Sequence, residues 1–206
     1  MDFSIGDPVQ PANRRQRPRH GGDLIQLGDD LRRLLDLLIE DVALQSAAMD
    51  AGRVTVDQWQ QQMAQSLLAA HYAGYGTGRG ATRFTPQEEA RITRIVGEQL
   101  DYLNRFAAEL DTRAWTAADA ARALLYMGNV KSVFWAGRTF GWDLPYMPAS
   151  GTACLGNCGC RWEGENLDEE ELTGTWRWVR GKSDSCPTCV QREAAGPIRF
   201  ISGERV

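Results

Sequence analysis

Five cysteines fall in the last quarter of this 206-residue chain, in two turns whose spacing suits a metal site. The first turn reads CLGNCGC from Cys154 to Cys160, and the second reads CPTC from Cys186 to Cys189. A structural zinc ion takes four ligands in a tetrahedron, and each turn can supply two thiolates. We therefore expect a structural zinc, because a closed shell of four thiolates leaves no open position for a catalytic water.

The candidate metal ligands are all cysteines: Cys154, Cys158, Cys160, Cys186 and Cys189. Cys186 and Cys189 form one pair, and Cys154 with either Cys158 or Cys160 forms the other. The spacing does not choose between Cys158 and Cys160, and we expect the surplus cysteine to be a buried free thiol. An odd, clustered set in a chain without a secretory signal favours metal over disulfides.

The interval between the two turns predicts a short β-hairpin. Residues 175–180, TWRWVR, alternate polar and bulky apolar side chains, and Cys160-Arg161-Trp162 is the expected partner strand. The result is a module that resembles a zinc ribbon. Six acidic residues lie between Glu163 and Glu171, and we interpret them as a solvated loop and not as a catalytic carboxylate pair.

Leucines spaced three and four residues apart predict a first helix from 24 to about 51, which Gly52 ends. Thr55 and Gln58 form a capping box that opens a second helix, expected to end near Tyr72. The glycines of residues 74–80 lack the Gly-Lys-Ser/Thr ending of a phosphate loop, so we interpret them as a flexible hinge.

Two further capping boxes predict two further helices. Thr85, Pro86 and Glu88 open a helix that runs to about Leu110, and Thr116 opens a fourth that continues through Phe134 to the glycines at 137 and 141. Five aromatic residues are expected to pack in the helical core: Trp59, Tyr102, Phe106, Trp115 and Phe134. The two histidines, His20 and His71, lie far from the cysteines in sequence, and we place His71 at a helix end.

These patterns predict a mainly α fold, a helical body of about four helices with a small C-terminal zinc-ribbon-like β module. The expected divisions are an extended or disordered arm at 1–22, a helical domain at 23–142 and a Cys-rich zinc-binding module at 143–206. No apolar run approaches the ~20 residues of a membrane-spanning helix, so no membrane association is expected. With no nucleophile and base at recognisable spacing, we expect no enzymatic activity.

The segments that carry these features resemble the minor head or head morphogenesis proteins of tailed bacteriophages. The likeness covers about residues 50–200: the run from Phe84 to Tyr126, an LP pair, and the segments CLGNCGCRW, WRW and SCPTCVQR. Some members carry His-x-x-Cys-x-Cys in the first turn. In this chain Cys154 occupies roughly the histidine's place, so the resemblance implies that Cys154 is a ligand.

The resemblance implies a structural or assembly protein of the virion, a minor capsid protein near the portal or neck. The implied partners are phage portal, capsid or neck proteins and further copies of the chain, and the implied location is the virion, with assembly in the host cytoplasm. The alternative is a zinc-ribbon nucleic-acid-binding protein, in which arginines 14–19 track phosphates while Trp162, Trp176 and Trp178 stack on bases. Seven basic against nine acidic residues in 151–206 disfavour it.

Overall fold

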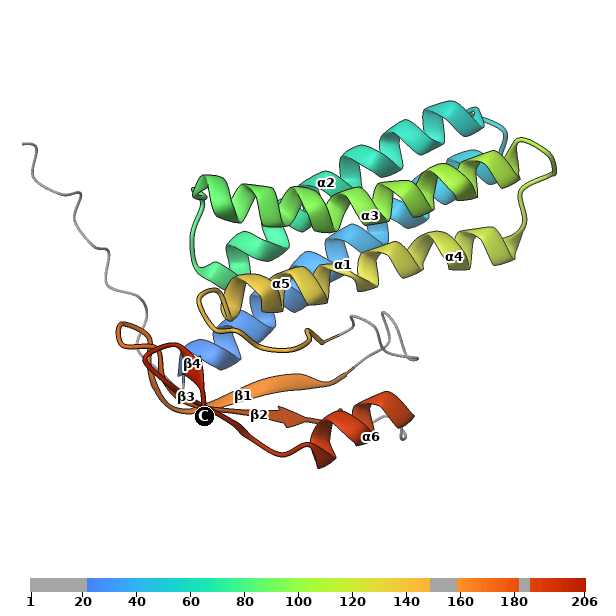
Figure 1. The fold of residues 1–206 in the computed structure, drawn as a ribbon. Coiled ribbons are helices and arrows are strands. Elements are labelled where there is room, and N and C mark those ends of the chain that lie inside the picture. The colour runs from blue at the N-terminus through green and yellow to red at the C-terminus, as the bar shows by residue number, and fades with distance from the viewer. Residues whose placement is uncertain (1–21, 149–158, 182–185) are drawn as a thin grey trace, which may run out of the picture.

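The computed structural model describes residues 22–148, 159–181 and 186–206. Within these ranges five helices precede a small sheet, with one more helix inserted between its strands (Figure 1). The helices and strands have the following bounds: α1 Gly22–Asp50, α2 Val56–Arg79, α3 Pro86–Leu110, α4 Ala117–Gly128, α5 Val130–Arg138, β1 Arg161–Asp168, β2 Thr173–Val179, α6 Pro187–Ala194, β3 Ile198–Ile201 and β4 Glu204–Arg205. The predicted mainly α fold with a small C-terminal β unit is confirmed.

The predicted helix starts are correct because capping side chains satisfy backbone N–H groups that have no partner within the helix. The Thr55 hydroxyl accepts a hydrogen bond from the N–H of Gln58, and the Gln58 side chain accepts one from the N–H of Thr55. Thr85 and Glu88 repeat this reciprocal pair at the start of α3. The chain therefore encodes where these two helices begin within a few residues.

The prediction that α2 ends near Tyr72 and that residues 74–80 form a hinge is wrong. Helix α2 continues to Arg79, and Gly80 ends it in the left-handed conformation at φ 66°. The glycines allow the backbones of α2 and α5 to meet. A Cβ added at Gly78 would overlap the carbonyl oxygen of Phe134, and one added at Gly137 would overlap that of Tyr75.

Helix α2 is the centre of the helical body, because α1, α3 and α5 all pack against it. Its buried face carries Trp59, Met63 and Leu67, each fully buried, and the rings of Phe106 and Trp115 lie edge-on to Trp59. The expected fourth helix is broken at Asn129 into α4 and α5. None of the described helices is long and apolar enough to cross a membrane.

One of the five predicted core aromatic residues is on the surface. Tyr102 is 54% exposed, with the Arg105 guanidinium 4.6 Å from its ring centre. Tyr102 fits the apolar pattern of α3 but lies on a side of the helix that no other described helix covers. The other four aromatic predictions are confirmed, with Trp115 only partly buried.

The strands form one antiparallel sheet in the order β1-β2-β3-β4. The predicted hairpin is present as β1 and β2, and it pairs Trp162 with Trp178. Strands β3 and β4 and helix α6 were not anticipated from the sequence. One face of the sheet is buried and one is exposed, as the alternation of buried Trp176 and Trp178 with exposed Arg177 shows.

The close approach of α2 and α5 predicts opposite effects for two glycine-to-alanine changes. Gly78→Ala should destabilise the fold by about 2 kcal/mol or more, because its Cβ meets backbone that cannot rotate away. Gly97→Ala, in α3, has nothing within 4 Å of the added Cβ, and should stabilise by about 0.5–1 kcal/mol because alanine costs less entropy in a helix. Urea denaturation measures both, and equal effects would contradict this account of the interface.

Candidate metal centre

The antiparallel register of β1 and β2 brings the two cysteine-bearing segments to the same end of the hairpin. Arg161 pairs with Val179, so the same register places Cys160 opposite Arg180 one residue further and Gly159 opposite Gly181 two residues further. The last pair is in close backbone approach, since a Cβ added at Gly181 would lie 2.6 Å from the carbonyl carbon of Gly159. Two segments that are more than 20 residues apart in sequence therefore leave the sheet side by side.

The second cysteine turn opens helix α6, which contacts β2 (Figure 1). Cys186 is the N-cap residue, and its carbonyl oxygen accepts hydrogen bonds from the N–H groups of Cys189 at 2.9 Å and Val190 at 3.0 Å. This local geometry places the two cysteines on one turn of backbone. Cys189 is 2% exposed and Cys186 is half-buried.

Cys160, Cys186 and Cys189 all pack against one aromatic cluster on the buried face of the sheet. The buried members of this cluster are Trp142, Leu144, Trp162, Trp176, Trp178, Cys189 and Phe200. The Arg192 guanidinium of α6 lies 4.2 Å from the ring centre of Tyr146 and 5.3 Å from that of Trp178. These contacts hold α6, and with it the second cysteine turn, against the sheet.

The described residues contain part of the predicted ligand set. Cys160, Cys186 and Cys189 lie in the described ranges, while Cys154 and Cys158 lie outside them. In the ranges that the structure describes, no three His, Cys, Asp or Glu side chains form a group that could hold a metal ion. A four-thiolate site on this hairpin therefore requires at least one of Cys154 and Cys158.

The tryptophans that the nucleic-acid alternative needs are in the core. Trp162 and Trp176 are 2% exposed and Trp178 is 1% exposed, and the Trp162 indole donates a hydrogen bond to the Tyr146 carbonyl oxygen at 2.9 Å. Stacking on a base requires an exposed ring face. In this structure none of the three rings has a face exposed for such stacking.

The acidic stretch between Glu163 and Glu171 is only in part the solvated loop that was expected. Glu163 and Glu165 lie in β1, and the turn after β1 is held by Asp168, which accepts hydrogen bonds from the N–H groups of Glu170 and Glu171. Glu169 is different, because it forms an ion pair at 2.8 Å with Arg138 at the end of α5, with both side chains less than 20% exposed. This pair joins the sheet to the helical body.

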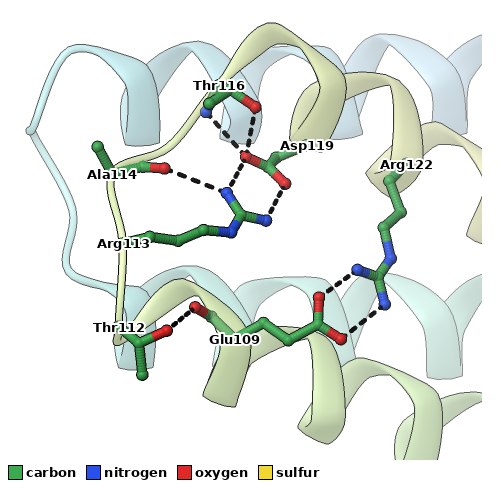
Figure 2. Close-up of polar contacts among 7 residues, drawn as sticks. All are labelled: Glu109, Thr112, Arg113, Ala114, Thr116, Asp119 and Arg122. Atoms are coloured by element: carbon green, nitrogen blue, oxygen red, sulfur yellow. Dashed lines mark hydrogen bonds and ion pairs between the residues drawn. The ribbon is translucent and has the colours of Figure 1, made fainter.

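A cluster of charged side chains lies at the corner between α3 and α4 (Figure 2). Arg113 donates two hydrogen bonds to the Asp119 carboxylate, at 2.7 and 2.6 Å, and the Thr116 N–H and hydroxyl donate to the same group. The Arg113 guanidinium is the main reason that the pKa of Asp119 lies well below its usual range. Both carboxylate oxygens have donors, so the cluster serves to hold the corner.

The prediction that His71 is a helix-end residue is wrong, because its side chain is fully buried within α2. Its Nδ1 lies 2.7 Å from the Leu67 carbonyl oxygen, and its Nε2 has no hydrogen-bond partner among the described residues. Burial lowers the pKa of His71 from its ordinary value of 6.5, and the hydrogen bond to Leu67 offsets part of that effect. The folded protein therefore holds His71 neutral at neutral pH.

This burial predicts a loss of stability in mild acid. A lowered pKa in the folded state means that the unfolded chain binds a proton first, so stability falls as the pH drops below 6.5. For one group the loss reaches at most about 1.4 kcal/mol per pH unit. His71→Leu should remove this part of the decline between pH 7.5 and 5.5 in urea denaturation, and His20→Leu serves as the control. An unchanged pH dependence in His71→Leu would refute the assignment.

No protein-family model, curated protein or solved structure matches this chain. The assignment of the site therefore depends on the chain's own residues and geometry. What these establish is a mainly helical protein whose small antiparallel sheet brings two cysteine-bearing segments together at one end.

Proposed function

We propose that this chain is a structural or assembly protein of a tailed-phage virion, which acts through protein–protein contacts and whose C-terminal module is held by one structural zinc ion. The register of the β1–β2 hairpin is the observation that carries the zinc part. It directs the segment before Arg161 and the segment after Val179 to the same place, and each segment contains a cysteine turn. The virion part is supported by the resemblance of those turns and of residues 84–126 to minor head proteins.

Cys186 and Cys189 would supply two of the four thiolates, and Cys154 with either Cys158 or Cys160 would supply the others. All of these donors are cysteine sulfur, which is the chemistry that zinc and other soft metals prefer. A bound zinc ion would join the segment that precedes β1 to the segment that opens α6. Metal binding would then contribute directly to the folding of this end of the protein.

The polar groups of the described residues support a structural role over a nucleic-acid-binding one. Two arginines on the outer face of the sheet pair with acids, Arg161 with Glu163 and Arg177 with Glu165. A surface that binds phosphates usually has a basic surplus. The three tryptophans are buried in the core. Neither the charge of this module nor its aromatic rings therefore favour nucleic-acid binding.

The zinc part predicts one zinc ion per chain in protein purified under reducing conditions, measured by inductively coupled plasma mass spectrometry. Cys186→Ser and Cys189→Ser should each reduce the bound zinc at least tenfold. Among Cys154→Ser, Cys158→Ser and Cys160→Ser, one variant should retain full occupancy, because only four of the five thiolates bind. Thr188→Ala, between the two essential cysteines, is the matched control. Full zinc loss in all five cysteine variants, or no zinc in the unmodified chain, would contradict the four-thiolate site.

The assembly part predicts that the chain is found in purified phage particles or bound to their portal or capsid protein. Quantitative mass spectrometry of particles from the source phage gives the number of copies per portal protein. A ratio near one indicates a portal-ring or neck component, and a much larger ratio indicates the capsid shell. If the chain neither occurs in particles nor binds portal or capsid protein, the proposal is overturned, whatever its zinc content.

A further inference from the structure

The second cysteine turn holds two thiols at a spacing that fits a disulfide bond. Cys186 and Cys189 both carry thiols in the described structure, and the N–H groups of Cys189 and Val190 both donate to the carbonyl oxygen of Cys186. Cys186 therefore lies on the first turn of α6. Two Cα atoms three residues apart on an α-helix are separated by about 5 Å, as its rise and radius require. Disulfides join Cα atoms about 4.4–6.8 Å apart, so the pair lies within their range.

The two thiols differ in their access to solvent. Cys189 is 2% exposed and is a buried member of the aromatic cluster, whereas Cys186 is only partly buried against that cluster. The rate of thiol–disulfide exchange depends on the access of the attacking sulfur to the incoming disulfide. A small disulfide therefore reaches Cys186 first, and Cys189 is placed to complete the exchange from within the protein.

Cys160 packs against the same cluster but does not join the pair. In the part of the chain that the structure describes, no three His, Cys, Asp or Glu side chains form a group that could hold a metal ion. Cys160 therefore does not lie close to both Cys186 and Cys189. The backbone of α6 already holds those two on one turn, so little conformational entropy is lost when their sulfurs join.

We propose that Cys186 and Cys189 form a redox-active dithiol whose co-reactant is a small disulfide such as glutathione disulfide. The Cys186 sulfur attacks one sulfur of the co-reactant, forms a mixed disulfide and releases one glutathione. The Cys189 sulfur then attacks the Cys186 sulfur and releases the second glutathione. The protein loses two electrons and two protons, and the co-reactant gains them as it is reduced to two thiols.

The same two thiols are ligands in the proposed zinc site, and the following consequence rests on that proposed function. A thiolate that binds zinc cannot at the same time form a disulfide, so metal binding and oxidation of the pair exclude each other. Oxidation would remove two of the four ligands and release the metal. The module would then hold zinc only where small disulfides are scarce.

Oxidation of the metal-free full chain tests the pairing. The chain is treated with a chelator and then with glutathione disulfide, the remaining thiols are alkylated, and mass spectrometry maps the disulfides. We expect the disulfide between Cys186 and Cys189 of one chain to be at least fivefold more abundant than any other disulfide. Thr188→Ala is the matched control and should leave this yield unchanged. A main disulfide that includes a third cysteine or joins two chains would overturn the proposal.

Trapping of the mixed disulfide tests the order of the two steps. In Cys189→Ser the second step cannot occur, so peptide mapping should find glutathione attached to Cys186. In Cys186→Ser the remaining thiol of the pair is buried, and we expect at least fivefold less glutathione on Cys189. Equal trapping in the two variants would overturn the assigned order. The disulfide map of the unmodified chain needs neither variant, so a folding defect in one of them leaves the test of the pairing intact.

Zinc content separates this proposal from the zinc site. In the zinc-loaded chain we expect oxidation of the pair to be at least tenfold slower, with zinc released in step with the disulfide, as measured with a chromogenic chelator. If the unmodified chain binds no zinc, the zinc site is wrong and the disulfide map still decides the redox pair. If zinc binds but the metal-free chain forms no Cys186–Cys189 disulfide, only the redox pair is wrong. A disulfide that forms without zinc release would overturn the mutual exclusion.

Discussion

The backbone contact between α2 and α5 is the constraint on which the rest of the structure depends. Gly78 and Gly137 allow the two helices to approach until a single added methyl group would overlap a carbonyl oxygen. This contact sets the position of the end of α5. There Trp135 packs against the aromatic cluster on the buried face of the sheet, and Arg138 forms an ion pair with Glu169. The sheet is therefore positioned through this helix.

The C-terminal module has its own core, formed by the aromatic cluster on the buried face of the sheet. The aromatic cluster is buried on one side of the sheet, with Trp162 paired to Trp178 across the hairpin and Arg192 over the Tyr146 ring. Cys189 is a buried member of this cluster, and Cys160 and Cys186 are partly buried against it. The cluster therefore fixes the positions of three of the five cysteines.

Buried polar groups differ in how completely they are hydrogen-bonded, and Asp119 and His71 show the two extremes. The Asp119 carboxylate receives donors on both oxygens, so its charge stabilises the corner between α3 and α4. His71 has one ring nitrogen satisfied and one without a partner among the described residues. Ionisation of such a side chain in the core costs free energy, which links the stability of the fold to pH.

The sequence by itself determined the helix starts, the hairpin and the mainly α class, because capping boxes and apolar spacing are local signals. It did not reveal that the glycines at 74–80 extend α2, since a glycine's role as a contact appears only when α5 lies against it. Nor did it separate Trp162 in the core from Tyr102 on the surface. Both are aromatic residues in regular elements, and only tertiary packing decides which side of an element is covered.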